Sequence, residues 1–181
     1  MSKWLLWLMG GIMLGGIVHL ATVLWLPRTA TQDAYSRLLP VTPVNQVTTL
    51  PEPSPEKGLL PYVDPAFATA VCRYDLSEGP LQLSLNVSQA YTSVSFYTRY
   101  GRPYYAINDR AAGRRVIELD LMTEQQHNEM PEEEDVTAAD RLIVESPTRT
   151  GVIVMKALAP EPGLMTMARD ALATGRCRPQ S

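Results

Sequence analysis

The sequence has few side chains that bind transition metals, with two cysteines and two histidines among 181 residues. A structural zinc site or an iron–sulfur cluster takes four such ligands, so we expect no metal and no cofactor. The sequence also lacks an excess of positive charge, because 19 Asp and Glu side chains outnumber 16 Lys and Arg side chains. This balance argues against nucleic acid as a partner.

Charged residues are scarcest in the N-terminal segment, where residues 4–26 contain none. At 1.5 Å per residue, a helix of this length measures about 35 Å and crosses a hydrocarbon core of about 30 Å. All three tryptophans, Trp4, Trp7 and Trp25, lie near its two ends, as in the aromatic belt of a membrane span. We therefore predict a transmembrane anchor over residues 1–26. The alternative is a cleavable signal peptide, whose apolar part is usually shorter, about 7–15 residues.

The two cysteines, Cys72 and Cys177, indicate on which side of the membrane the rest of the chain lies. A disulfide between them would close a loop of about a hundred residues and form only in an oxidising compartment. It therefore predicts that the C-terminal part lies outside the cytoplasm. Two buried free thiols are the alternative. Lys3 before the span and Arg28 after it leave the positive-inside count nearly balanced.

Small residues form a strip along the predicted span. Gly11 and Gly15 make a G-x-x-x-G pair, and His19 continues the same face. This spacing lets a second helix approach closely, so we expect pairing with another copy or with another membrane protein. The alternative is that the glycines reflect their high frequency in membrane helices and that His19 is neutral and has no partner.

A proline-rich segment follows, with seven prolines between positions 40 and 65. Such a composition favours an extended polyproline-type chain, so we predict a tether over residues 27–60. Residues 29–39 could form a short helix at the membrane surface. The remainder, residues 61–181, is predicted to be a globular, β-rich, extracytoplasmic domain.

Periodicity and turn residues predict the elements of this domain. Asp64-Pro65 resembles a helix start, giving a helix through Cys72. Residues 164–174 form a second helix that Gly175 ends. Alternating or β-branched segments predict strands, of which the last two form a hairpin across residues 147–150. The expected strands are 81–85, 91–98, 104–107, 116–121, 141–145 and 151–158. The fold class is thus mainly β, an antiparallel sandwich or partly open barrel of about six strands with a helix at each end, and the disulfide would join the two helices.

One stretch resembles a known group of proteins. Phe96-Tyr97, Gly101 and the run Ala106-Ile107-Asn108-Asp109-Arg110 are similar to a stretch of bacterial envelope proteins in the domain-of-unknown-function families DUF1254 and DUF1214. Asp64-Pro65, Cys72, Gly79-Pro80 and Cys177 also resemble the small, singly anchored members of this group. The resemblance implies a β-rich domain on one membrane helix, in the inner membrane of a bacterium and facing the periplasm. It implies no activity.

No residue set predicts catalysis. The one histidine outside the span, His127, lies in a polar segment that reads as a solvated helix. Glu118 and Asp120 alternate on one strand, which is typical of its solvent face. The acidic run 132–135 lacks the spacing of a calcium loop. We therefore assign no catalytic residue.

Tyrosines and arginines gather instead around the 97–107 hairpin. If the hairpin pairs as predicted, these side chains collect at one end of the sheet and suit a carboxylated, phosphorylated or sugar-like ligand, or a protein partner. The alternative is an internal Asp109–Arg110 ion pair that closes the loop. A non-catalytic binding module is the favoured function, with an envelope hydrolase or carbohydrate-processing enzyme as the second possibility. The candidate binding residues are Tyr97, Arg99, Tyr104, Asn108, Asp109, Arg110, Arg114 and Arg115.

Overall fold

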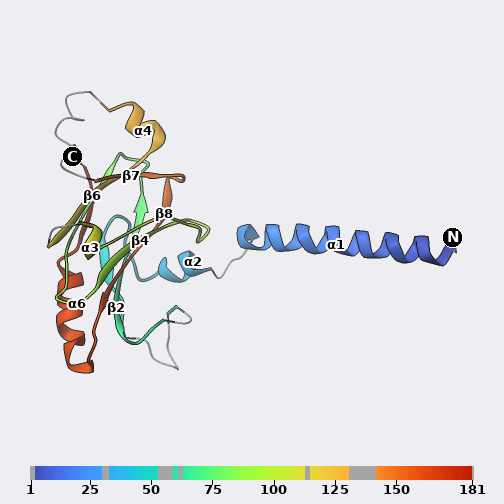
Figure 1. Cartoon of the computed structure of the whole chain (residues 1–181). Helices are drawn as coiled ribbons and strands as arrows, with labels where there is room; N and C mark the ends of the chain where they lie inside the picture. Colours follow the sequence, from blue (N-terminus) through green and yellow to red (C-terminus); the bar gives the residue numbers. More distant parts are fainter. Residues whose placement is uncertain are drawn as a thin grey trace. The chain divides into compact units, whose positions relative to one another are not determined.

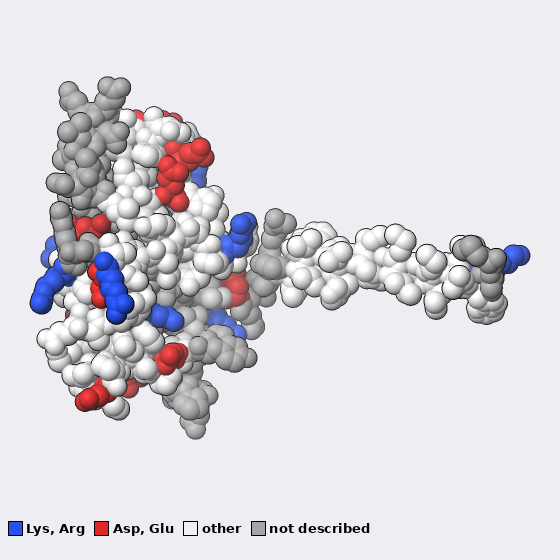
Figure 2. Space-filling model, viewed as in Figure 1, with Lys and Arg blue, Asp and Glu red and all other residues white. Residues whose placement is uncertain are grey.

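The computed structural model divides into two units, Met1–Asp33 and Ala34–Ser181, the second of which we call the β-rich unit. It describes residues 3–29, 33–52, 59–60, 63–112, 115–130 and 142–180. The first unit is essentially one helix, α1 (Lys3–Thr29), the blue helix of Figure 1. On the face that Figure 2 shows, the middle of this helix has no charged side chain. Helix α1 is the one helix in the described part of the chain that is long and apolar enough to cross a membrane. A signal sequence would pass the same test.

The β-rich unit contains two sheets (Figure 1). One sheet has the order β1-β2-β8-β4-β5 and the other β7-β6-β3-β9. All pairs are antiparallel except β6 with β7. The strands described are β1 (Val47–Thr49), β2 (Phe67–Asp75), β3 (Leu81–Asn86), β4 (Thr92–Thr98), β5 (Pro103–Asn108), β6 (Val116–Thr123), β7 (Leu142–Ser146), β8 (Thr150–Leu158) and β9 (Arg176–Pro179).

The core lies between the sheets. Every second side chain of a strand such as β3 points into it, as the alternation in the sequence predicts. Leu81, Leu83 and Leu85 of β3 are fully buried, while the residues between them are not. They pack with Phe96 and Ile153 from the other sheet in one hydrophobic cluster. Both sheets therefore bury one face against the other, which confirms the mainly β fold class.

Short helices lie at the two ends of this unit, with α4 and α6 at opposite ends in Figure 1. The last helix buries Ala168 and Leu172 in the core. The described helices are α2 (Ala34–Leu38), α3 (Asp109–Ala112), α4 (Glu124–Asn128), the 3-10 turn η1 (Pro162–Leu164) and α6 (Met165–Ala173).

The helix predicted from Asp64 to Cys72 is wrong, because these residues lead into strand β2. Asp64 does cap a turn, since its carboxylate accepts the Ala66 N–H at 2.9 Å, but the turn ends there. The strand that follows buries five consecutive residues, Ala68–Cys72. One of its faces packs in the core between the sheets and the other packs with Leu38 and Leu50, so both faces are covered and the sequence shows no alternation.

The predicted hairpin between the last two long strands is also wrong. Strands β7 and β8 both form, yet β7 pairs in parallel with β6, and β8 lies in the other sheet between β2 and β4. The three-residue connection between them, residues 147–149, therefore crosses from one sheet to the other. Strands β1 and β9 were not predicted, and both are short edge strands.

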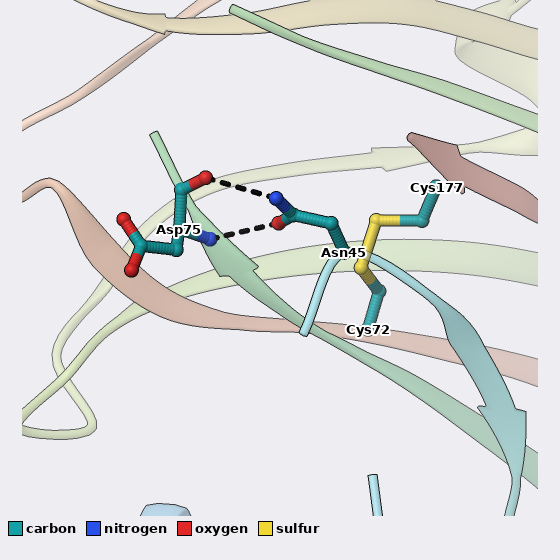
Figure 3. The surroundings of a disulfide bond; sticks show 4 residues. All are labelled: Asn45, Cys72, Asp75 and Cys177. Carbon is teal, nitrogen blue, oxygen red and sulfur yellow. Dashed lines mark hydrogen bonds between the residues drawn. A yellow bond between two sulfur atoms is a disulfide. The ribbon is translucent and has the colours of Figure 1, made fainter. Parts of the chain in front are cut away.

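Cys72 and Cys177 form the predicted disulfide (Figure 3). It joins β2 to β9, and so one sheet to the other, rather than the two helices that the sequence suggested. Both cysteines are buried, at 0% and 4% exposure. The bond is therefore part of the core.

Much of the predicted tether is packed on the β-rich unit. Leu38 and Leu50 are buried with Val71 and Val152 in a second cluster on the outer face of the five-stranded sheet. Strand β1 pairs with β2. The composition of residues 27–60 did not reveal this packing, because the apolar residues that make it are separated by prolines. Residues 30–32 and 53–58 lie outside the described residues.

Candidate functional site

The predicted binding residues lie on the β4–β5 hairpin and the turn after it, but at two different ends. Tyr97 pairs with Pro103 beside the turn, while Asn108 pairs with Ser93 at the opposite end. Four residues of strand separate these positions, about 13 Å. The residues therefore form two groups and not one cluster. Arg114 lies outside the described residues.

Arg99 is engaged with helix α2. Its guanidinium lies 4.1 Å from the centre of the Tyr35 ring, and that of Arg73 lies 5.6 Å from the same centre. Arg73 also donates to the Thr42 carbonyl at 3.0 and 3.3 Å. Two cation–π contacts and these hydrogen bonds therefore fasten α2 and the segment after it to the five-stranded sheet.

At the far end, Asn108 and Asp109 bond to nearby backbone. The Asn108 side chain accepts the Ala111 N–H at 3.0 Å, and the Asp109 carboxylate accepts the Thr92 N–H at 3.4 Å. Asp109 thus helps to close the loop through a backbone donor. Arg110 and Arg115 are exposed.

Tyr104 belongs to a chain of hydroxyl groups that starts at the core. Its hydroxyl donates to that of Tyr74 at 3.1 Å, and Tyr74 lies 2.9 Å from the Ser146 hydroxyl. Ser146 donates to the Thr148 carbonyl at 2.7 Å. Tyr74 also donates to the Tyr97 carbonyl at 3.3 Å. Since each hydroxyl has one proton and Ser146 donates to Thr148, the single proton of Tyr74 is shared between the Tyr97 carbonyl and the Ser146 oxygen.

Burial controls the ionisation of this chain. It raises the pKa of the Tyr104 phenol well above its usual value, and the neighbouring Tyr74 raises it further. Tyr74 is fully buried. The Tyr104 phenol therefore remains a protonated donor at neutral pH.

An open cleft of about 960 Å³, solvent included, lies where this chain reaches the surface. One wall is α4, which begins in a capping box between Thr123 and Gln126. Gln126 also donates to the Leu76 carbonyl at 2.8 Å, and His127 contacts Glu145 at 2.7 Å, so α4 is held against the sheets. The residues that line the cleft are Tyr104, Thr123, Glu124, Gln125, Glu145, Ser146, Pro147, Thr148 and Arg149.

The hydroxyl group of Ser146 is engaged in hydrogen bonds to the neighbouring backbone. Ser146 donates its proton to a backbone carbonyl, and its oxygen accepts from the Thr148 N–H at 3.3 Å. A serine nucleophile needs a base at that proton, and His127 instead contacts Glu145. Within the ranges described, no three His, Cys, Asp or Glu side chains lie close enough to hold a metal ion.

Sequence reasoning identified Tyr104 but missed Tyr74 and Ser146. These two are 72 positions apart. Tyr74 follows the segment predicted to be a helix, and Ser146 follows the predicted strand 141–145. Only the crossing of β7 and β8 from one sheet to the other brings Ser146 beside Tyr74, so no local signal marks the pair.

Comparisons with known proteins agree with the fold. The VPA0106 protein from Vibrio parahaemolyticus has a TM-score of 0.60 at 13% identity, over 82% of this chain and 34% of that one. An uncharacterised protein from Burkholderia cenocepacia has a TM-score of 0.48 at 10% identity, over 79% and 36%. This chain therefore spans about a third of either protein.

Sequence comparison is more specific about the family. No curated protein matches the chain. Residues 44–179 match the model of a protein family of unknown function, DUF1254, one of the two families that the 96–110 stretch resembles. The match covers the β-rich unit, leaves out α1, and exceeds half of the chain, so this chain belongs to the DUF1254 family.

Proposed function

We propose that this protein is a single-pass membrane protein whose β-rich unit lies in the bacterial periplasm and acts there as a non-catalytic binding module. The observation that carries the proposal is the disulfide Cys72–Cys177. Cytosolic thiols are kept reduced, and a buried bond between two sheets has to form while the domain folds. An oxidising compartment on the far side of the membrane meets that need.

Helix α1 supports an anchor that stays in the protein. Trp4 at one end and Leu24 near the other are 85% and 71% exposed, and its apolar side chains surround the helix. A helix that is apolar on every side is stable in lipid and not in water. Gly11, Gly15 and His19 form the face through which we expect it to pair with a second membrane helix.

The cleft beside Tyr104 is the binding site in this proposal. Its carboxylates accept hydrogen bonds and Arg149 donates them. Its serine and threonine hydroxyls, whose protons are donated within the protein, offer further acceptor oxygens. Tyr104, which also lines the cleft, adds an aromatic side chain. This mixture suits a ligand rich in hydroxyl groups, such as a glycan of the cell envelope. Arg110 and Arg115, at the other end of the hairpin, stay a predicted contact for a protein partner.

Two measurements test the proposal. In intact spheroplasts, external protease should digest the β-rich unit, and an alkylation mass shift should appear only after reduction and denaturation. Mature protein that lacks α1, or that carries free thiols in the cell, would contradict the location.

Binding is tested by titrating soluble glycan fragments into the detergent-solubilised full chain. Glu145→Gln should weaken binding about tenfold, as loss of a charge-assisted hydrogen bond does. Glu118→Gln, on an exposed position of β6, is the matched control and should change nothing. Hydrolysis of the glycan by the protein would contradict the non-catalytic binding module and support the hydrolase alternative.

A further inference from the structure

Exposed apolar side chains of the β-rich unit concentrate next to helix α2. Leu39, Val41 and Val44 follow within six positions and are 47%, 44% and 42% exposed. Tyr100, at 53%, is the most exposed large hydrophobic residue among those described in this unit. Water-facing leucine and valine side chains at this density point to a surface that something else covers.

The contacts around Tyr35 bring these side chains into one neighbourhood. Arg99, which precedes Tyr100, lies over the Tyr35 ring of α2. Arg73 lies over the same ring, and its strand forms a bridge with Val44. The turn at 99–102 and the segment 39–44 therefore flank the same short helix.

Positive charges outnumber negative charges in this neighbourhood. Residues 34–44 and 97–102 contain Arg37, Arg99 and Arg102 and no acidic residue, while Asp33 directly precedes α2 and Asp75 is bonded to Asn45, the residue after Val44. The chain as a whole carries a net charge of −3. Basic, tyrosine and aliphatic side chains together are the composition of surfaces that bind the headgroup region of anionic bilayers.

The length of chain between α1 and α2 sets how far such a surface can be from the membrane. Helix α1 ends at Thr29 and α2 begins at Ala34. Five residue steps span at most about 17 Å even when fully extended. A bilayer surface is thus within reach of α2 whenever α1 is in the membrane.

We propose that the β-rich unit docks on the anionic surface of the bilayer through Arg37, Leu39, Val41, Val44, Tyr100 and Arg102, which we call the α2 surface. The inference rests on the proposed function, because it requires α1 to stay in the membrane. The aliphatic side chains enter the headgroup region, the tyrosine ring lies at its boundary, and the arginines bind lipid phosphates. Docking holds the domain on the membrane, so its cleft meets ligands close to the bilayer.

The test places an environment-sensitive fluorophore on the full chain at Val41→Cys, with the native disulfide intact, and reconstitutes the protein in vesicles that contain nitroxide-labelled lipids. Vesicles of phosphatidylglycerol and phosphatidylcholine are compared with phosphatidylcholine alone. Met167→Cys in α6, whose native side chain is 47% exposed, is the matched control. We expect at least twofold stronger quenching at position 41 than at position 167 in the anionic vesicles. In 1 M salt, this difference in quenching should disappear.

A pair of charge reversals tests the arginines. Arg37→Glu with Arg102→Glu should reduce quenching at position 41 by half or more. Arg176→Glu with Arg178→Glu makes the same change in charge on exposed positions of β9 and should leave it unchanged. Equal quenching at positions 41 and 167, or equal quenching in neutral and anionic vesicles, would overturn the inference.

Flotation and carbonate extraction of the same samples separate the two proposals. Protein that resists extraction but shows no quenching at position 41 retains the anchor and refutes the docking. Protein that is extracted refutes the anchor itself, and the docking with it.

Discussion

The side chain of Asn45 takes the place of a neighbouring strand for Asp75 (Figure 3). Its carbonyl oxygen accepts the Asp75 N–H at 2.8 Å, and its amide donates to the Asp75 carbonyl at 3.1 Å. Asn45 reaches this position with a φ of 55°, which asparagine tolerates better than most residues. One side chain thus satisfies the backbone N–H and C=O of Asp75, the last residue of β2. Strand β1 does not extend far enough to pair with this residue.

Asn45→Gly should therefore lower the free energy of unfolding by about 1–3 kcal/mol, because glycine keeps the backbone angle but leaves two backbone groups without partners. Urea denaturation measures the change. Gln46→Gly, at the adjacent exposed position, introduces the same backbone freedom and should cost less than 1 kcal/mol. Equal effects would mean that the two hydrogen bonds contribute nothing.

Removing the disulfide by Cys72→Ala with Cys177→Ala should lower the free energy of unfolding by about 4–5 kcal/mol, because the bond closes a loop of 105 residues. Thermal unfolding of oxidised wild type and of the double variant measures this. Since both cysteines are buried, the native bond should also resist dithiothreitol until denaturant is added. Fast reduction of the native protein would contradict the buried position.

Gly151→Ala should destabilise the protein severely, by about 3 kcal/mol or more. A methyl group at this position would overlap the Tyr97 carbonyl oxygen and the Tyr74 hydroxyl. Gly163→Ala adds the same group into open space and should have little effect. Adding Tyr74→Phe should rescue only part of the loss, because the Tyr97 carbonyl remains; full stability of Gly151→Ala would refute this packing.

Stability should fall at high pH because of Tyr104. Its pKa is raised in the folded state, by burial first, so above the ordinary tyrosine pKa of about 10 the unfolded chain loses a proton that the folded one keeps. Stability is then fully present below pH 10 and decreases as pH rises, by up to about 1.4 kcal/mol per pH unit.

Urea denaturation between pH 8 and 11 measures this slope. Tyr104→Phe should be less stable at pH 8, because the hydrogen bond to Tyr74 is lost, yet show a shallower decline with pH. Parallel declines in the two proteins would assign the titration to other groups.

The predicted pairing of helix α1 with a second membrane helix is tested by a substitution of Gly15. Gly15→Leu should weaken self-association, or association with a partner helix, in a membrane two-hybrid assay, because leucine blocks close approach. Ile17→Ala, about 200° around the helix from Gly15, is the control and should have little effect. Unchanged association of Gly15→Leu would remove the small-residue face from the proposal.

Local periodicity predicted the strands that have one open face. In β3, buried leucines alternate with less buried polar residues, and the strand lies where the sequence suggested. Strand β6 also lies where the sequence suggested, but Asp120, expected on its solvent face, is buried together with Met122. Strand β2 was mistaken for a helix because it is covered on both faces and has no alternation. The short strands β1 and β9 carry too few residues to show a period.

The sequence determined by itself the long apolar helix, the mainly β class and which two cysteines a disulfide would join, because these follow from composition, alternation and the presence of only two cysteines. That the disulfide forms is shown by the structure. The tertiary structure alone decided which strands are neighbours. It sent β7 and β8 to different sheets, joined Tyr74 to Ser146, and placed Arg99 on the Tyr35 ring. A period of two tells which face of a strand is buried, but the strand beside it is chosen by contacts between residues far apart in the chain.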